Sequence, residues 1–164
     1  EVYNDNPRDF LNFVNEGVTG RINSGFVTGL AGHFGARQKD GSRKLILSHA
    51  GHKQVLIYRK KQDAVELINL PNGTVMGIPG TTASRAKALD LHVGDRFYAF
   101  TDGIVEASAP NGEEFGMERV IESFKELSAK PIKEAIDTLY DKVAKYTKSP
   151  DQQDDITILA FELT

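Results

Sequence analysis

The segment Arg96-Phe97-Tyr98-Ala99-Phe100 decides the fold assignment, and Thr101-Asp102-Gly103 follows it directly. Apolar side chains at consecutive positions are typical of a strand that is buried on both faces of its sheet. The C-terminal segment 156–163 is apolar at nearly every position in the same way. We therefore expect two neighbouring strands, with the C-terminal one inserted beside residues 96–100.

Two β-hairpins are predicted on the N-terminal side of this segment. Residues 26–30 and 44–48 flank Lys39-Asp40-Gly41-Ser42, where Asp-Gly favours the positive φ of a tight turn. Residues 55–58 and 65–68 flank a second, polar turn at 60–63. Most of the chain up to about residue 78 is therefore predicted to be strands and turns.

A helix is expected near the N-terminus. Asn6 is a good N-cap and Pro7 suits the first helical position, while Gly17 is the predicted stop. The apolar side of this helix would consist of Phe10, Leu11 and Val14.

Two amphipathic helices are expected before the last strand, because apolar residues recur there at the spacing of a core-facing helix. The first stripe consists of Met117, Val120, Ile121, Phe124 and Leu127, and the second of Ile132, Ala135, Ile136, Leu139, Tyr140, Val143 and Ala144. A block of strands, a helix pair and one returning strand indicate an α+β fold rather than alternating β/α units.

Length and composition exclude several classes of protein. The 164 residues suit one domain over 1–164, and a net charge of −3 argues against a basic nucleic-acid-binding module. No apolar run is long enough for a membrane span, and the N-terminus lacks the pattern of a signal peptide. The absence of Cys excludes disulfides, thiolate zinc sites and cysteine nucleophiles. We expect a cytoplasmic domain with no nucleic-acid partner and no membrane contact.

Two acidic clusters lie at the ends of the predicted buried strands. Asp102 directly follows one strand, and Asp154-Asp155 directly precede the other. If these strands are antiparallel neighbours, Asp102 and Asp154 would meet at one sheet edge, within about 6 Å of each other. Carboxylates placed together repel, so this arrangement favours a hard divalent cation, which Gly103 would allow the backbone to approach. The alternative is an ordinary turn at Asp102-Gly103 and a surface cap at Asp154.

The histidines support a weaker metal hypothesis. His49 and His52 could supply nitrogen ligands, but no third nitrogen or sulfur donor lies nearby in the sequence. A turn at the end of a strand is the simpler interpretation of this segment. His33 and His92 are isolated and receive no role.

Six short segments follow one another in a characteristic order. They are Phe26-Val27-Thr28, Ser48-His49-Ala50-Gly51-His52, Leu91-His92-Val93-Gly94-Asp95, Thr101-Asp102-Gly103-Ile104-Val105-Glu106-Ala107, Phe115-Gly116-Met117-Glu118-Arg119 and Asp154-Asp155-Ile156-Thr157. Together they resemble the motif series of the SpoIIE-like bacterial serine phosphatases, which belong to the metal-dependent PPM (type 2C) protein phosphatases. Each segment is weak evidence alone, and their shared order and spacing make the resemblance specific.

This resemblance implies an α+β fold with an antiparallel β-sandwich flanked by helices, in αββα layers. It also implies an active site with two Mn²⁺ or Mg²⁺ ions, in which Asp102 and Asp154 are catalytic metal ligands and Asp155 a further ligand beside them. Water activated by the two metals would attack a phosphoserine or phosphothreonine directly, with no phosphoenzyme. His52 matches the end of the family's Ala-Gly-His motif and would line the site without a catalytic role.

The chain departs from the family pattern at its N-terminus. Family members carry an Asp-x-Ser-Gly-x-Gly-like segment upstream of the Phe-Val-Thr strand, and the Asp of that segment bridges both metals. No part of residues 1–25 matches it. We expect this segment to precede the chain in a longer parent, so that the chain is the C-terminal two-thirds to three-quarters of the domain and nearly inactive alone. Natural loss of the segment is the alternative.

Three functions follow as hypotheses. The first is a protein phosphatase of a bacterial partner-switching pathway, with a phosphorylated STAS-type anti-anti-sigma factor as substrate and a sensor domain upstream. The second is a non-catalytic pseudophosphatase, a regulatory module that binds phosphoproteins. The third is an unrelated metal-dependent hydrolase that uses His49 and His52.

Overall fold

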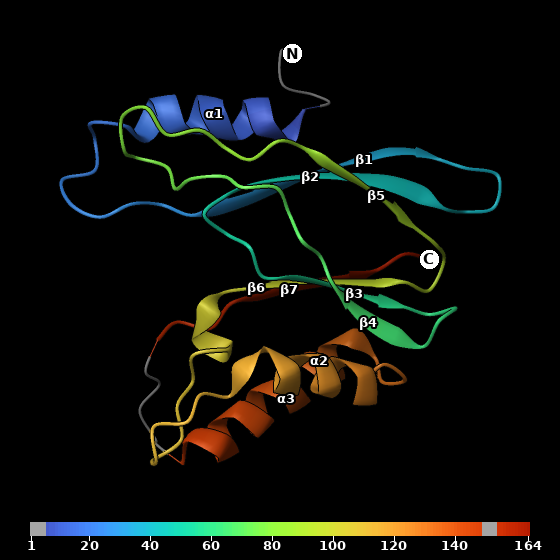
Figure 1. The fold of residues 1–164 in the computed structure, drawn as a ribbon. Coiled ribbons are helices and arrows are strands. Elements are labelled where there is room, and N and C mark those ends of the chain that lie inside the picture. Colours follow the sequence, from blue (N-terminus) through green and yellow to red (C-terminus); the bar gives the residue numbers. More distant parts are fainter. Residues whose placement is uncertain (1–5, 149–153) are drawn as a thin grey trace. The chain divides into compact units, whose positions relative to one another are not determined.

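The computed structural model describes residues 6–148 and 154–164. The chain divides into two compact units, the first formed by Glu1–Lys53 and Asn69–His92 and the second by Gln54–Ile68 and Val93–Thr164. Each unit contains one antiparallel sheet and its own helices (Figure 1), which confirms the α+β prediction. None of the helices in the described ranges is long and apolar enough to cross a membrane.

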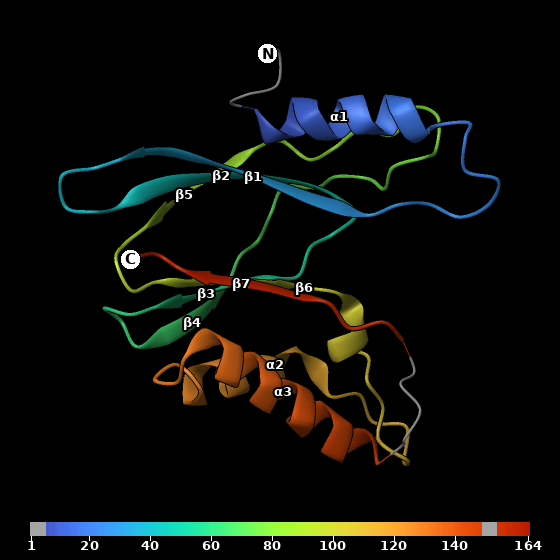
Figure 2. The same cartoon turned by 180° about the vertical axis from the view of Figure 1, so that it is seen from behind.

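The first unit consists of a three-stranded sheet and one helix. The sheet has the order β1-β2-β5, with β1 at Gly29–Arg37, β2 at Arg43–Ala50 and β5 at Lys87–Leu91. Helix α1 (Pro7–Val18) lies along one face of this sheet (Figure 2). Its core cluster contains Leu11, Ala50, Met76 and Ala83, with Val14, Val18 and Ala31 packed against it.

Helix α1 begins as predicted and ends later. The side chain of Asn6 accepts a hydrogen bond from the backbone N–H of Arg8, and Pro7 occupies the first helical position. Gly17 lies inside the last turn rather than at the stop, because Thr19 donates its N–H to the Asn15 carbonyl and closes the helix there. Phe10 was expected on the apolar side but is 46% exposed.

The first predicted hairpin is confirmed, but its first strand is displaced. β1 pairs with β2 from Gly29↔Ala50 to Arg37↔Arg43 across the predicted Asp-Gly turn, and Phe26 lies outside it. Local β-propensity favours residues 26–30, whereas pairing with the apolar β2 fixes the strand further along the chain. β5 was not predicted from the sequence.

Buried polar groups close the first unit between β2 and the segment that precedes β5. Ser84 accepts the His49 N–H through its hydroxyl (2.9 Å) and donates its own N–H to the His49 carbonyl (2.8 Å). Ser48 donates its hydroxyl to the Ser84 carbonyl at 2.9 Å. A Cβ on Gly73 would lie 2.5 Å from the Ser84 nitrogen and 2.6 Å from the His49 oxygen. Only glycine at position 73 therefore allows its backbone to lie this close to the backbones of Ser84 and His49.

The second unit is built on a four-stranded sheet of order β4-β3-β6-β7. The strands are β3 (Val55–Arg59), β4 (Ala64–Leu67), β6 (Arg96–Phe100) and β7 (Ile158–Glu162). The second predicted hairpin and the antiparallel pairing of β6 with β7 are both confirmed. β7 starts at Ile158 rather than Ile156. As the edge strand it is only partly buried, with Leu159 59% exposed, so the expectation of burial on two faces was wrong for β7.

Two helices cover one face of this sheet, namely α2 (Gly116–Glu126) and α3 (Ile132–Thr147), as Figures 1 and 2 show. Their core is apolar and aromatic: the rings of Tyr98 and Phe124 stack with centroids 3.9 Å apart. The buried stripe of α3 is narrower than predicted and consists of Ala135, Leu139 and Val143. Ile136 is only half-buried, and Tyr140 and Ala144 are exposed, because α3 touches the sheet and α2 along one side only.

Candidate functional site

The candidate site lies where β6 ends beside the start of β7. Thr101 donates its N–H to the Thr157 carbonyl at 3.1 Å, and the Thr157 N–H donates to the Thr101 hydroxyl at 3.0 Å. That hydroxyl in turn donates to the Asp155 carbonyl at 2.9 Å. Three hydrogen bonds thus extend the strand pairing by one residue and hold the next position, Asp102, against the segment that enters β7.

Asp102 opens the 3-10 helix η1 (Asp102–Ile104), and the backbone of η1 passes directly against the second acidic cluster. A Cβ on Gly103 would lie 2.7 Å from the Asp155 carbonyl oxygen and 3.5 Å from the Asp154 Cβ. No larger residue fits there without moving the backbone of Asp155. The structure therefore brings the three predicted acidic residues into two adjoining segments of the second unit.

The surroundings of these carboxylates suit a cation arriving from solvent. Asp102, Asp154 and Asp155 are all exposed, whereas Gly103 and Ile104 are buried and anchor the turn. The Asp155 N–H donates to Asp154 Oδ1 at 2.7 Å, which orients that carboxylate. Carboxylate oxygens are the donors that Mg²⁺ and Mn²⁺ prefer.

The donor set is nevertheless partial. Among the residues that the structure describes, no three His, Asp or Glu side chains are grouped closely enough to hold a metal ion. Asp102, Asp154 and Asp155 therefore fit part of the ligand set that two hard cations need, and the predicted separation of about 6 Å between the Asp102 and Asp154 carboxylates stays a prediction.

His49 has a structural environment. It is fully buried, and its Nε2–H donates to the Pro71 carbonyl at 2.7 Å, since a carbonyl oxygen only accepts. Burial lowers the pKa of His49 below its usual value, so the ring is neutral. With Nε2 occupied, only the buried Nδ1 of His49 could bind a metal, and among the described residues no group of three His, Asp or Glu side chains could hold one, which argues against a hydrolase built on His49 and His52. His52 belongs to the first unit, and its expected place in the site stays a prediction.

Thr101 is a residue of the candidate site that the sequence alone did not single out. It was noted only as a member of a motif, yet its hydroxyl both donates to Asp155 and accepts from Thr157. Threonine at the end of a buried strand, one residue before an acid, was the available signal, but its partners lie more than fifty residues away and become visible only in the structure.

In the described part of the chain, two antiparallel sheets and three α-helices form an α+β fold like that of the PPM protein phosphatases. The family model of stage II sporulation protein E (SpoIIE) matches residues 3–164. The chain belongs to the SpoIIE family, whose solved members include PP2C phosphatase domains. Comparison with curated proteins gives no match.

Solved structures share this fold at low sequence identity. The RsbU and RsbW domains of a Mycobacterium tuberculosis protein match with a TM-score of 0.69 and 20% identity, over 94% of this chain and 41% of that one. The SiaA PP2C domain of Pseudomonas aeruginosa matches at 0.59 and 24%, over 75% and 52%. The manganese-presoaked SpoIIE phosphatase domain of Bacillus subtilis matches at 0.57 and 20%, over 82% and 56%. The chain spans about half the length of these relatives.

Proposed function

We propose that this chain carries the metal-binding C-terminal part of a phosphoserine/phosphothreonine protein phosphatase. Asp102 and Asp154 would hold Mn²⁺ or Mg²⁺, with Asp155 beside them. The observation that carries this proposal is the contact of the Gly103 backbone with the Asp154–Asp155 backbone, which places two exposed acidic segments together. The manganese-presoaked structure of the Bacillus subtilis relative supports the choice of cation.

The protein's own groups would act by positioning. The Thr101 hydroxyl bonds to Asp155 and Thr157 set the alignment of the end of β6 with the segment that enters β7, and this alignment would let the Asp102 and Asp154 carboxylates share one edge. The Asp155 N–H keeps one Asp154 oxygen oriented. When bound, the two ions would lower the pKa of a water and neutralise charge on the transferred phosphoryl group. The exposed edge leaves room for a phosphorylated segment of another protein.

The proposed substrate is a phosphorylated protein of a bacterial partner-switching pathway, such as a STAS-type anti-anti-sigma factor, with a sensor domain upstream in the parent. Support for this pathway comes from the similarity to the RsbU domain, which occurs in one solved structure together with an RsbW domain. A non-catalytic phosphoprotein-binding module is the second candidate. It is favoured by the lack of a three-ligand group among the described residues.

The test measures Mn²⁺ binding and phosphopeptide hydrolysis by the full-length protein that contains this chain. Asp102→Asn should lower hydrolysis of a phosphoserine peptide by about 100-fold or more, since several kcal/mol of electrostatic stabilisation would be lost. It should also weaken Mn²⁺ binding measured by calorimetry. Asp141→Asn is the matched control, because Asp141 is an exposed acid on α3 away from η1.

The 164-residue chain alone should hydrolyse the peptide at a rate near background. Two adjacent cations need a shared anionic ligand, and residues 1–25 contain no match to the family segment whose Asp supplies it. Strong metal-dependent turnover by this chain would contradict the idea that the site is partial. A full-length protein that binds phosphoproteins but hydrolyses none of them would favour the pseudophosphatase.

A further inference from the structure

Arg119 ends the fifth of the six sequence motifs and lies in the first turn of α2. Its guanidinium donates to the Phe115 carbonyl at 2.9 Å and to the Glu114 carbonyl at 3.1 Å. It also pairs with the Glu113 carboxylate and lies 5.0 Å from the centroid of the Tyr146 ring. Although the side chain of Arg119 is partly exposed, these four partners hold it in one place.

These contacts need the planar fork of an arginine. A guanidinium can donate to two carbonyls and a carboxylate at once while its flat face covers an aromatic ring, whereas a lysine ammonium is a compact point charge. An exposed ion pair by itself stabilises little. The two bonds to backbone carbonyls therefore distinguish Arg119 from an ordinary surface charge.

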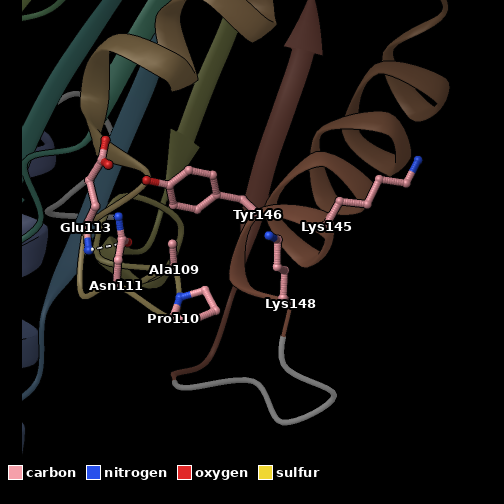
Figure 3. A pocket seen from close by; sticks show the side chains of 7 residues that line it. All are labelled: Ala109, Pro110, Asn111, Glu113, Lys145, Tyr146 and Lys148. Atoms are coloured by element: carbon pink, nitrogen blue, oxygen red, sulfur yellow. Dashed lines mark hydrogen bonds between the residues drawn. The ribbon is translucent and has the colours of Figure 1, made fainter.

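The carbonyls that Arg119 binds lie at the end of the loop that runs from η1 to α2, residues 105–115. The loop is folded back on itself, since the Ala109 N–H donates to the Glu113 carbonyl at 2.9 Å and the Gly112 N–H to the Ala109 carbonyl at 2.8 Å. A pocket of about 450 Å³ lies between the tip of this loop and the end of α3 (Figure 3). Because side chains do not fill this space, the tip depends on hydrogen bonds more than on close packing.

Tyr146 gives the loop a second support, from the last turn of α3. Its hydroxyl donates to the Glu114 carbonyl at 3.1 Å, and its ring meets the Phe115 ring edge-on with centroids 5.3 Å apart. Figure 3 shows the Tyr146 ring reaching from α3 across to the loop. Arg119 and Tyr146 together hold the returning half of the loop between α2 and α3.

Backbone hydrogen bonds connect this support to Asp102. The Gly116 N–H, at the start of α2, donates to the Val105 carbonyl at 2.9 Å, and the Glu106 N–H donates to the Asp102 carbonyl at 2.9 Å. The end of η1 is therefore tied to the start of α2, while its beginning is tied by Thr101 to the segment that enters β7. The backbone of Asp102 is held from both sides.

We propose that Arg119 is a positioning residue of the candidate phosphatase site: by fixing the loop between η1 and α2, it holds the Asp102 backbone where the carboxylate can bind a metal ion. The proposal rests on the proposed function and adds to it a residue that acts without contact with the ion. Replacing residues that orient metal ligands typically changes metal affinity or activity by about 10- to 100-fold. Arg119 acts through the backbone, so we expect the lower end of that range.

The test compares two variants of the full-length protein that contains this chain. Arg119→Lys keeps the positive charge but loses the fork, so the dissociation constant for Mn²⁺ measured by calorimetry should rise about tenfold. Glu113→Gln removes only the ion pair and leaves both carbonyl bonds of Arg119, so it should change this constant less than about twofold. Lys142→Gln is the matched control, because Lys142 joins α3 to α2 through Glu126.

Two further measurements separate positioning from a general loss of stability. At limiting Mn²⁺, kcat on a phosphoserine peptide should fall about tenfold in Arg119→Lys and recover at saturating Mn²⁺, with KM for the peptide unchanged. The backbone amides of residues 105–116 should exchange hydrogen faster in this variant, while those of residues 96–100 keep their rate. The urea midpoint should match that of Lys142→Gln.

The outcomes distinguish this proposal from the proposed function. Wild-type Mn²⁺ affinity in Arg119→Lys, or faster exchange throughout the second unit, would overturn the positioning role while Asp102→Asn still abolished hydrolysis. A wild-type protein that neither bound Mn²⁺ nor hydrolysed the peptide would contradict the phosphatase function instead. Exchange of residues 105–116 would then still show whether Arg119 holds the loop.

Discussion

Each of the two units is stabilised internally by a different kind of interaction. The second unit buries an apolar cluster in which Phe124 and Leu139 are fully excluded from solvent. The first unit closes through buried polar groups, with Ser48, His49 and Ser84 joined by hydrogen bonds and Gly73 pressed against them. Apolar packing tolerates small changes of shape, whereas a buried polar closure fails when one partner is lost or displaced.

The largest expected effect lies in the apolar unit. Leu139→Asp should lower the free energy of unfolding by about 4 kcal/mol or more, because it places an unpaired charge at a fully buried position. Ile136→Asp should cost about 1–2 kcal/mol, since Ile136 is half-buried, and exposed Ala144→Asp at most about 1 kcal/mol. Urea denaturation followed by circular dichroism measures all three. Equal losses would show that α3 buries the broad stripe expected from its sequence.

The next largest loss of stability is expected where the buried hydrogen bonds join Ser48, His49 and Ser84. Gly73→Ala should cost about 2–3 kcal/mol, because its Cβ would lie 2.5 Å from the Ser84 nitrogen and 2.6 Å from the His49 oxygen and would push the residue 73 backbone away from both. The control is Gly17→Ala, since nothing lies within 4 Å of a Cβ at Gly17. In the last turn of α1 this change should stabilise the protein by at most about 0.5–1 kcal/mol. Two variants of similar stability would mean that the two backbones do not approach as described.

The smallest effect concerns the pH dependence of the same closure. Burial lowers the pKa of His49 below 6.5, so below that pH the unfolded chain binds a proton that the folded chain does not. The stability from neutral His49 is therefore fully present above pH 6.5 and is lost as pH falls toward the lower folded pKa. At pH 7.5 His49→Gln should cost about 1 kcal/mol, the value of the hydrogen bond to Pro71.

That difference between wild type and His49→Gln should narrow as pH is lowered, in denaturation curves taken at several pH values. The other histidines are present in both proteins and cancel. A difference that stays constant down to pH 5 would show that His49 gains its proton equally in the folded and unfolded chains.

Hydrophobic spacing was enough to predict the elements of the second unit. The apolar stripes of α2 and α3 and the antiparallel pairing of β6 with β7 follow from residues that lie close together in sequence or share one pattern. The first unit was harder to predict. β1 contains three glycines and is a strand because of its pairing with β2, and β5 alternates buried Leu89 and Leu91 with exposed Asp90 over too few positions to stand out.

The candidate site likewise has features that the sequence pattern predicts and features that depend on the folded structure. Acids at the ends of two buried strands could be recognised in the sequence, because strand pairing alone brings such ends together. The Thr101 hydroxyl bonds and the close approach at Gly103 depend on the register of that pairing, which one residue of slip would change. His49 was indistinguishable from a ligand in the sequence, since burial is a property of the folded chain.

The pairing of β6 with β7 also sets an order of events during synthesis. Arg96 and Glu162, which form an ion pair across these strands, are 66 positions apart, so β6 leaves the ribosome long before its partner. Until then β6 has an open edge on that side, and closing so long a loop is entropically slow. Asp154 and Asp155 arrive on the segment that leads into β7. The acidic edge is therefore completed only after residue 155 has been synthesised, and a nascent chain stalled before residue 154 would present the β6 edge to other strands without yet having the means to bind a cation.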